Sequence, residues 1–418
     1  MSYEICVLGL GYIGLPTASV FATRGKRVLG VDVVPRVVET INRGDIHIQE
    51  PDLDILVRAA VQSGNLVAST QPQPARNFII AVPTPFQWTA DNPRAPDLSY
   101  VEAATRSLAA VVAPGNLVIL ESTSPVGTTE KVREWLLDEL AKRKAPNLAA
   151  LCESLLFAHC PERILPGQML KELIVNDRIA GGLTPEAARA AEELYRTFCT
   201  GQIFVTGARM AEMCKLTENA SRDAGIAFAN ELSQICDHLG LDVWELIQLA
   251  NRHPRVKILQ PGPGVGGHCI AVDPWFIVAA APAQARLIRT AREVNDAKPG
   301  QVVAQIKAAA ARCPAPVIAC LGLAFKADVD DLRESPAVEI VQHLATERVG
   351  TILAVEPHVS ALPASLADRA HPVELVTLAA ALERANIIVL LVNHREFAKP
   401  DASLLAGKCL IDTRGAWR

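Results

Sequence analysis

The sequence lacks the features that would mark a metal centre, a disulfide framework or a nucleic-acid-binding protein. Its ten cysteines are scattered, and no two of them stand at the CxxC spacing of structural zinc sites. We therefore expect no metal, and unpaired thiols suit a reducing cytoplasm better than an oxidising compartment. The net charge of −4 includes no basic excess, which argues against a nucleic-acid partner.

Long apolar segments are also absent. The longest aliphatic run, Ile387 to Val392, is far too short to cross a bilayer, and the chain starts without a charged leader or a cleavable apolar segment. We expect a cytoplasmic protein with no membrane anchor. Its 418 residues, 50% of them hydrophobic and 21% charged, suffice for two or three soluble domains.

A glycine-rich turn near the N-terminus joins a strand pattern to a helix pattern. The apolar run Ile5–Leu8 predicts a buried parallel strand, and helical spacing follows as far as Gly25. A second apolar run, Val28–Val31, ends in Asp32. In this context a GxGxxG pattern indicates a dinucleotide site more strongly than a bare structural turn. The glycines, which let backbone N–H groups approach a pyrophosphate, are Gly9, Gly11 and Gly14.

The choice between NAD and NADP depends on Asp32. Its carboxylate would accept hydrogen bonds from an adenosine ribose and would repel a 2′-phosphate. Arg36 supports the alternative, because a guanidinium close to the strand end suits that phosphate. We predict NAD.

Two threonines follow further predicted strands. Thr84 comes after Phe78–Val82, and Thr123 comes after Leu117–Leu120. Ligands of an open parallel sheet bind at the carboxyl ends of its strands, so both threonines are candidate cofactor contacts. Turn and capping chemistry is the alternative for either residue.

A proline-bounded loop after the predicted strand Leu156–His159 carries Glu162 and Arg163. Its prolines favour an extended, stiff path. A glutamate beside the cofactor would serve as a base or hold a water. The alternative is a surface ion pair between these two neighbours.

A long helix is predicted over Ala208–Leu239, where breakers are few and apolar residues recur with helical spacing. Lys215, Asn219 and Arg222 stand at i, i+4 and i+7 and so share one face. A solvated polar face is the ordinary interpretation. A lysine–asparagine pair within a site would instead stabilise negative charge on a substrate oxygen.

A second glycine-rich loop carries one thiol. Four glycines fall within residues 262–267, and Cys269 and Asp273 follow. Such a loop allows a ligand to pack closely, so Cys269 is a candidate nucleophile beside a substrate groove. The alternative is a buried packing cysteine. The cationic turn at 251–255 precedes the loop and suits a phosphate or a carboxylate.

The last part of the chain repeats the organisation of the first. The run Val317–Gly322 predicts a strand into a glycine turn, and Ser335-Pro336 predicts a helix start. We predict an α/β protein with two Rossmann-like, doubly wound domains joined by a central helical region. The expected domains are an NAD-binding domain over 1–206, a central helical region over 207–300, and a second nucleotide-binding fold over 301–418, whose nucleotide the pattern does not identify.

The chain resembles the UDP-glucose/GDP-mannose dehydrogenase family over nearly its whole length. The motifs that carry the resemblance, in order, are GLGYIGLP, VPTPF, ESTSPVGTT, CPERILPG, KLTENASRDAGIAFANEL, NRHPRVKILQPGPGVGGHCIAVDPWF and LAFKADVDDLRESP. The PER and HCIAVDPWF forms are similar to the branch that oxidises UDP-N-acetyl-D-mannosamine for surface polysaccharides. UDP-N-acetylglucosamine 6-dehydrogenases are the neighbouring alternative.

The resemblance implies an oxidation with two hydride transfers from the sugar's primary alcohol to NAD, by way of a thiohemiacetal and a thioester on Cys269. Water then releases the uronate. The implied oxyanion stabilisers are Lys215, also a proton donor and acceptor, and Asn219. Asp273 and Glu162 are the residues implied to handle water and protons.

The resemblance and the motifs together assign two sets of contacts. Cofactor contacts are expected at Gly9, Gly11, Tyr12, Ile13, Gly14, Asp32, Arg36, Thr84, Thr123 and Arg333. Substrate contacts are expected at Arg163, Ile164, Lys215, Asn219, Arg222, His253, Arg255, Gly266, Lys326 and Arg418. The family also implies that residues 207–300 form the dimerisation and catalytic region and that residues 301–418 bind the UDP-sugar. It implies a homodimer or larger homo-oligomer, in which His253 and Arg255 reach the neighbour's site.

Two other functions remain open at this point. A two-electron hydroxy-acid dehydrogenase would share the N-terminal architecture but would need no nucleophilic cysteine. A non-catalytic NAD-binding regulator is the second alternative, and the presence of Lys215, Asn219 and Cys269 argues against it.

Overall fold

The computed structural model describes residues 3–48, 50–87, 94–144, 148–164, 167–267, 269–367, 372–398 and 400–417. The chain divides into two compact units, one of residues 1–218 with 279–281 and one of residues 219–278 with 282–418. Within the described ranges, no helix is both long and apolar enough to cross a membrane.

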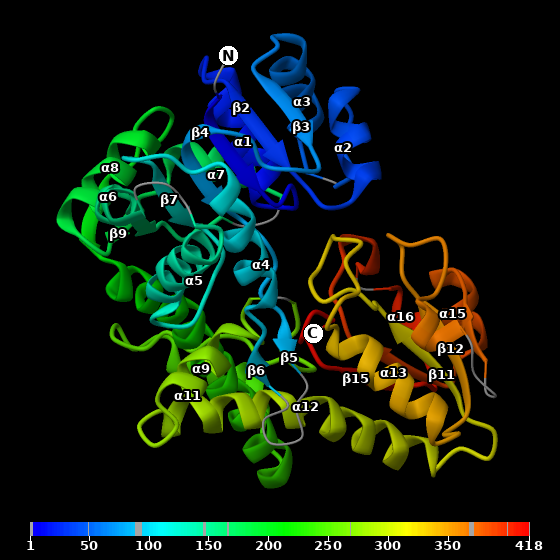
Figure 1. The fold of residues 1–418 in the computed structure, drawn as a ribbon. Helices are drawn as coiled ribbons and strands as arrows, with labels where there is room; N and C mark the ends of the chain where they lie inside the picture. Colours follow the sequence, from blue (N-terminus) through cyan, green and yellow to red (C-terminus); the bar gives the residue numbers. More distant parts are fainter. Residues whose placement is uncertain are drawn as a thin grey trace. The chain divides into compact units, whose positions relative to one another are not determined.

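The first unit is built on an eight-stranded sheet. Its spatial order is β10 (Ile203–Gly207), β9 (Arg178–Gly182), β8 (Leu156–His159), β7 (Leu117–Leu120), β4 (Ala75–Ile80), β1 (Tyr3–Leu8), β2 (Val28–Val31) and β3 (Leu66–Ser69). Figure 1 shows β2 and β3 side by side at one end of this order. All neighbours pair in parallel except β8 and β9, which are antiparallel. A short hairpin joins β5 (Phe86–Gln87) and β6 (Ala95–Pro96).

Helices cover both faces of this sheet, because successive strand residues point to opposite sides. Ile5 and Val7 belong to one core cluster, and Cys6 and Leu8 belong to another. The first face packs against α1 (Gly14–Thr23), α2 (Pro35–Asn42), α3 (Leu53–Gln62), α7 (Met169–Val175) and α8 (Pro185–Tyr195). The second face packs against α4 (Ser99–Ser107), η1 (Leu108–Ala110), α5 (Thr128–Lys142) and α6 (Leu148–Ser154). The doubly wound prediction is confirmed.

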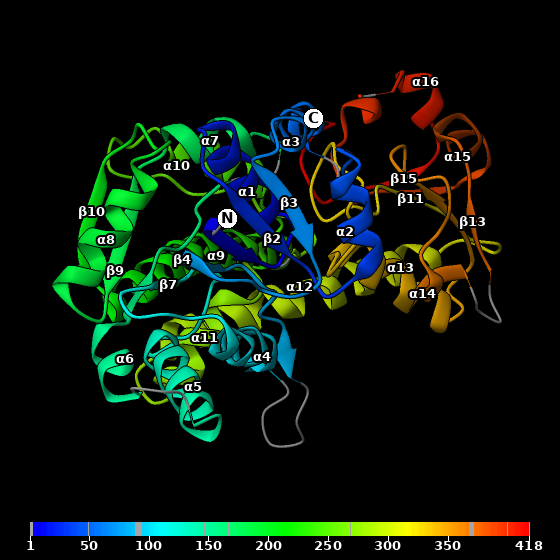
Figure 2. The same cartoon turned by 45° about the horizontal axis from the view of Figure 1, so that its top comes forward.

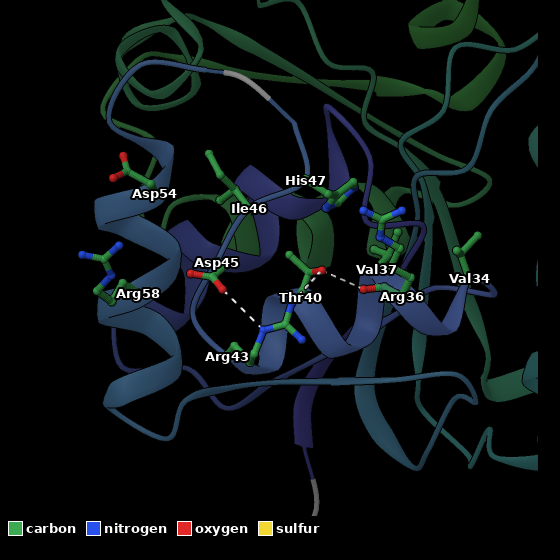
Figure 3. A pocket seen from close by; sticks show the side chains of 10 residues that line it. All are labelled: Val34, Arg36, Val37, Thr40, Arg43, Asp45, Ile46, His47, Asp54 and Arg58. Carbon is green, nitrogen blue, oxygen red and sulfur yellow. Dashed lines mark hydrogen bonds and ion pairs between the residues drawn. The ribbon is translucent and has the colours of Figure 1, made fainter.

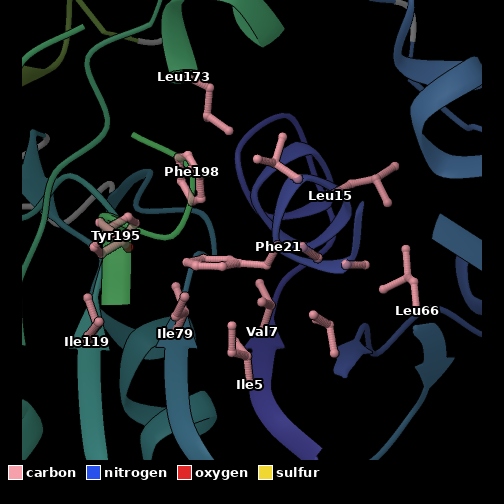
Figure 4. Packing of buried hydrophobic residues seen from close by; sticks show 14 of the residues in the cluster. Ile5, Val7, Leu15, Phe21, Leu66, Ile79, Ile119, Leu173, Tyr195 and Phe198 are labelled. Carbon is pink, nitrogen blue, oxygen red and sulfur yellow. The ribbon is translucent and has the colours of Figure 1, made fainter. Parts of the chain in front are cut away.

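An aromatic group closes the first face. The ring of Phe21 lies 4.8 Å from that of Phe198 and 5.9 Å from that of Tyr195, centroid to centroid. Figure 4 shows Phe21 reaching from α1 toward these two rings, above the strand residues Ile79 and Val7.

The predicted long helix is confirmed as α9 (Ala208–Leu239), and the division between the units falls between Glu218 and Asn219 within it. The second unit continues with α10 (Val243–Ala250), α11 (Asp273–Ala280) and α12 (Arg286–Ala310). Helix α12 includes Pro299 and continues beyond it for more than two further turns.

The second unit ends in a five-stranded parallel sheet. Its order is β13 (Val373–Leu375), β12 (Thr351–Val355), β11 (Val317–Leu321), β14 (Ile387–Leu390) and β15 (Cys409–Asp412). One face packs on α12, α13 (Pro336–Thr346) and α14 (Ala364–Ala367), and the other on α15 (Leu378–Arg384), η2 (Arg395–Phe397) and α16 (Ala402–Leu405). Figure 2 shows α13 and α14 on one side of these strands and α15 and α16 on the other.

Candidate functional site

The glycine turn after β1 forms an open cradle at the start of α1. A Cβ on Gly14 would lie 1.8 Å from the Gly9 carbonyl oxygen, so no side chain fits at the helix start. A Cβ on Gly11 would meet no atom within 4 Å. The backbone at Gly11 therefore faces open space at the helix N-terminus, which is the arrangement that a pyrophosphate requires.

Asp32 lies directly beside this cradle. Its Oδ2 accepts the Leu10 N–H at 3.1 Å, and its Oδ1 accepts the Val34 N–H at 3.0 Å. The carboxylate is half-buried, and each of its oxygens has the capacity to accept a further hydrogen bond, as from a ribose. Tyr12 and Ile13 complete the turn, and Tyr12 is 37% exposed.

A cavity of about 650 Å³ lies between α2 and α3 (Figure 3). Figure 3 shows Arg36 and Thr40 projecting from α2 and Arg58 projecting from α3 on the opposite wall. The Arg36 side chain is exposed and makes no hydrogen bond or ion pair with any described residue. Its positive charge is thus available near the end of β2, where the sequence placed a cofactor contact.

Thr84 and Thr123 are brought together at the carboxyl ends of neighbouring strands. The Thr84 hydroxyl donates to the Thr123 carbonyl oxygen at 2.7 Å. Both residues are half-buried. The bond joins the loops after β4 and β7, and the predicted cofactor contact of each residue stays a prediction.

Glu162 and Arg163 do not pair with each other through their charged groups. Glu162 Oε2 accepts Arg178 Nη2 at 2.7 Å, and the Arg163 guanidinium binds Glu218 at 2.6 Å. Glu162 is only 7% exposed. The alternative of a surface ion pair between the two neighbours is therefore wrong. Ile164 packs against the core of the first unit.

Lys215 and Asn219 occupy one face of α9, as their spacing predicted. Lys215 is half-buried and makes no hydrogen bond or ion pair with the described part of the chain. Asn219 Nδ2 donates to Asp273 Oδ2 at 2.5 Å. Arg222, one turn further, is exposed. The solvated-face interpretation fits Arg222 but not Asn219, whose amide is fixed by a buried carboxylate.

Cys269 is the exposed member of the ten cysteines, and the other nine are buried or half-buried. Its carbonyl oxygen accepts the N–H groups of Val272 at 3.1 Å and Asp273 at 2.9 Å, at the start of α11. The alternative of a buried packing cysteine is therefore excluded. An exposed thiol held at a helix start is accessible to a substrate carbonyl.

The glycine loop before Cys269 packs tightly on the C-terminal fold. A Cβ on Gly266 would lie 2.3 Å from the Glu334 carbonyl oxygen, and one on Gly262 would lie 2.7 Å from Arg414 Nη1. Burial lowers the pKa of Arg414 to about 10. Close approach to a backbone carbonyl therefore requires glycine at 266, whereas at 262 the neighbouring atoms belong to the Arg414 side chain.

The remaining predicted contacts lie at the surface. His253 Nδ1 accepts the Arg255 N–H at 3.3 Å, and both side chains are exposed. Lys326 is exposed, and the Arg333 guanidinium binds the Asp331 carboxylate at 2.7 Å. Arg418 lies outside the described residues. The substrate and cofactor roles of this group stay predictions.

Sequence reasoning missed Glu356, which directly follows β12 as Asp32 follows β2. Gly322 N–H donates to the Val355 carbonyl oxygen at 2.8 Å, as Gly9 N–H donates to that of Val31 at 2.8 Å. Glu356 is 4% exposed and accepts from the N–H groups of Leu323, Ala324 and His358 and from His394 Nε2. Its oxygens are occupied by protein donors, so it does not offer the second sheet a ribose contact like that of Asp32. The sequence did contain a signal for this residue. An acidic residue follows the second strand after a glycine turn in both parts of the chain, Asp32 in the first and Glu356 in the last.

One family matches nearly the whole chain. Residues 3–199 match the NAD binding domain of the UDP-glucose/GDP-mannose dehydrogenase family, residues 209–297 its central domain and residues 319–418 its UDP binding domain. The NAD binding domain coincides with the unit that carries the open cradle at Gly11, so the residues present fit the cofactor.

Individual proteins are similar over their full length. An NDP-N-acetyl-D-galactosaminuronic acid dehydrogenase of Ralstonia nicotianae is 60% identical over 413 residues, which are 99% of this chain and 96% of that protein. A UDP-N-acetyl-D-mannosamine dehydrogenase of Yersinia pestis is 55% identical over 430 residues, covering 100% of both. The solved structure of a UDP-D-ManNAc dehydrogenase from Pyrococcus horikoshii has a TM-score of 0.87 at 38% identity, covering 99% of this chain and 96% of that one. The chain therefore belongs to the UDP-glucose/GDP-mannose dehydrogenase family.

Proposed function

We propose that this protein oxidises the primary alcohol of UDP-N-acetyl-D-mannosamine to the carboxylate of UDP-N-acetyl-D-mannosaminuronate, for surface polysaccharide synthesis. The observation that carries the proposal is the exposed Cys269, placed at the start of α11 beside the Asn219–Asp273 pair. A single hydride transfer cannot turn an alcohol into a carboxylate. A nucleophile that retains the aldehyde between two oxidations is needed, and Cys269 is suited to that role.

NAD held at the glycine turn of Gly9, Gly11 and Gly14 would supply the hydride acceptor in each oxidation. In the first oxidation Lys215 takes the alcohol proton, and an aldehyde results. The Cys269 sulfur then bonds to the aldehyde carbon, and the carbonyl electron pair moves to oxygen, giving a thiohemiacetal. The second hydride leaves that carbon, and the oxygen electrons re-form the carbonyl bond of a thioester.

Hydrolysis completes the reaction. A water oxygen bonds to the thioester carbon, the carbon–sulfur bond breaks with its electron pair on sulfur, and the water protons are released through Glu162. Lys215 and Asn219 stabilise the negative oxygen at each tetrahedral stage. The hydrogen bond to Asp273 fixes the Asn219 amide so that its donors need no reorientation during the reaction.

The sugar is the finer part of the proposal. The relative at 55% identity is named for N-acetyl-D-mannosamine, which supports that substrate. The relative at 60% identity is named for N-acetyl-D-galactosaminuronic acid, which supports the second candidate, an N-acetylgalactosamine-type nucleotide sugar. UDP-N-acetylglucosamine is the further alternative that the motifs left open.

The other functional classes receive less support. A two-electron hydroxy-acid dehydrogenase would leave both the exposed thiol and the UDP binding domain without a role. A silent NAD-binding regulator would not need the hydrogen-bonded Asn219 and Asp273. We also propose that the protein acts as a homodimer or larger homo-oligomer.

A panel of nucleotide sugars tests the proposal. Purified protein is given NAD and, separately, the UDP derivatives of N-acetylmannosamine, N-acetylgalactosamine, N-acetylglucosamine and glucose, while NADH absorbance and product mass are followed. We expect NADH and a uronate from one N-acetylhexosamine far above the others. Oxidation of small hydroxy acids alone, or no NADH from any nucleotide sugar, would contradict the proposal.

A further inference from the structure

Glu162 and Arg163, which follow β8, form hydrogen bonds with Arg178 and Asp177 at the start of β9. Arg178 Nη2 donates to Glu162 Oε2 at 2.7 Å, and Arg163 Nη1 donates to the Asp177 carbonyl oxygen at 3.1 Å. The second oxygen of Glu162 accepts the Arg163 N–H at 2.7 Å. Both oxygens of Glu162 are therefore held, and the loop that carries it is fastened to β9 twice.

The ion pair between Arg178 and Glu162 is buried. Their side chains are 5% and 6% exposed. A buried pair is stable only when its geometry is good, and loss of one partner leaves an uncompensated charge. The charge of the buried Glu162 carboxylate is therefore compensated by Arg178, and loss of Arg178 would leave it uncompensated.

Two aromatic rings hold Arg178 in place. Its guanidinium lies 4.7 Å from the centroid of the Tyr195 ring and 5.2 Å from that of Phe198 (Figure 4 labels both rings). A planar guanidinium stacks on rings and donates in its own plane at the same time, which a lysine ammonium cannot reproduce. The rings thus orient the donor that reaches Glu162.

A second buried carboxyl lies in the same cluster and forms no ion pair with the described part of the chain. Glu121 is 1% exposed and accepts the Tyr195 hydroxyl at 2.8 Å. Burial, together with the charge of Glu162, raises the pKa of Glu121 to about 8, so Glu121 holds a proton at neutral pH. Burial also raises the pKa of the Cys160 thiol, which stays neutral. Within the described residues, Glu162 is the carboxylate that forms an ion pair with Arg178.

From this geometry we propose that Arg178 is a positioning residue, which keeps Glu162 charged and fixed so that Glu162 takes a proton from the water that cleaves the thioester. The inference rests on the proposed function, because it concerns the last step of that reaction. In that step the water oxygen bonds to the thioester carbon, the carbon–sulfur bond breaks with its electron pair on Cys269, and one water proton passes to Glu162.

The test uses three variants of the full chain. Arg178→Met keeps side-chain length and ring contact but removes the charge, and Arg178→Lys keeps the charge. Arg196→Met is the matched control, because Arg196 stands beside Tyr195 in sequence and pairs with Glu192 at the surface, with its side chain 54% exposed. Each protein is mixed with NAD and the preferred nucleotide sugar, quenched, and analysed by intact-protein mass and NADH absorbance.

We expect Arg178→Met to release NADH in the first turnover and then to accumulate the acyl adduct on Cys269. Its steady-state rate should fall by about 10²-fold, as for loss of a general base. Arg178→Lys should accumulate less adduct, and Arg196→Met should behave as wild type. If Arg178 served only to stabilise the fold, its loss would reduce all steps together and would not cause the uronyl group to accumulate on the Cys269 thiol.

The pH profile gives a second readout. Removing the cation disfavours the charged carboxylate, so the acid limb of the rate profile should move to higher pH in Arg178→Met and by less in Arg178→Lys. The other groups that interact with Glu162 are the Arg163 N–H, Glu121 and Cys160. Tyr195 interacts with Glu121 and Arg178, and all of these neighbours except Arg178 are unchanged in these variants.

A folded Arg178→Met protein with no adduct and a wild-type acid limb would overturn the inference. If Arg178→Met does not fold, Arg178→Lys decides, and it overturns the inference if it shows neither adduct nor shift. Failure of the proposed function looks different, because then the wild-type protein itself forms no NADH and no Cys269 adduct from any nucleotide sugar.

Discussion

Asn219 on α9 and Asp273 at the start of α11 are joined by a hydrogen bond of 2.5 Å from Nδ2 to Oδ2. The N–H of the same Asp273 donates to the Cys269 carbonyl oxygen at 2.9 Å. One residue therefore connects the proposed oxyanion donor with the backbone of the proposed nucleophile. Its carboxylate is 2% exposed, so this connection lies out of solvent.

This connection predicts the effect of Asp273→Ala. Without the acceptor, the Asn219 amide loses its fixed orientation, and kcat should fall by about 10²-fold, with KM changed much less. Asp242→Ala is the control, since Asp242 caps α10 by accepting the Trp244 and Glu245 N–H groups at an exposed position. The control should lose about 1 kcal/mol of stability and keep wild-type kcat. An unchanged kcat in folded Asp273→Ala would refute the connection.

Cofactor preference should reside in Asp32. Its carboxylate stands beside the cradle and repels a 2′-phosphate, so we expect kcat/KM for NAD to exceed that for NADP in the wild-type protein. Asp32→Ser should reduce this ratio, because the Arg36 guanidinium, which pairs with no described residue, would then attract the phosphate without a nearby carboxylate opposing it. Glu39→Ser removes the same charge from an exposed position on α2 and should leave the ratio unchanged. Equal kcat/KM values for both cofactors in the wild-type protein would count against this assignment.

The helices and strands that depend on local sequence patterns have nearly the same bounds in the structure as in the sequence-based prediction. The strand Leu117–Leu120 and the helix Ala208–Leu239 have the predicted bounds, and the Ser335 hydroxyl accepts the Ala337 N–H at the start of α13. These features depend on periodicity and on capping chemistry, which a short stretch of sequence contains.

The contacts that define the site are mostly non-local and were not predictable. The residue types at Glu162 and Asn219 were evident, but their partners Arg178 and Asp273 lie 16 and 54 residues away. The antiparallel pairing of β8 with β9 brings the start of β9 to the Glu162 loop, and the sequence contained no signal for that pairing. The chemical role of a side chain was thus predictable where its residue type alone suggests that role. The contacts between segments distant in the sequence were not predictable.

Stability at low pH should depend on His159. Its side chain is fully buried in β8, and burial lowers its pKa to about 3. The unfolded chain binds the proton more strongly, so stability falls as pH drops below about 6.5, by up to about 1.4 kcal/mol per pH unit until the folded pKa is approached.

His159→Leu removes this titration and should flatten the loss of stability between about pH 7 and about pH 5. Urea unfolding at both pH values measures the effect. His238→Leu, at an exposed position near the end of α9, is the control and should retain the wild-type slope. Equal slopes for wild type and His159→Leu would show that His159 does not govern acid sensitivity.

Sharing of sites between subunits is testable by complementation. We expect His253 and Arg255, both exposed on one turn, to reach the active site of a neighbouring subunit. A His253→Ala/Arg255→Ala variant and a Cys269→Ala variant should each be inactive, and mixing them should restore part of the activity in hybrid oligomers. Arg252→Ala/Lys257→Ala removes two charges from the same turn and should stay active alone. Demonstrated subunit exchange without any recovery would exclude donation across the interface.

The central claim is that Cys269 carries the sugar between two oxidations. The measurement is the ratio of NADH formed to uronate formed, with the uronate identified by mass, in the wild-type protein and in Cys269→Ala. We predict two NADH per uronate with little free aldehyde in the wild type, and a loss of uronate formation of about 10³-fold or more in the variant. Uronate formation by Cys269→Ala at near the wild-type rate would contradict the account, because Cys269 would then serve only to pack the loop.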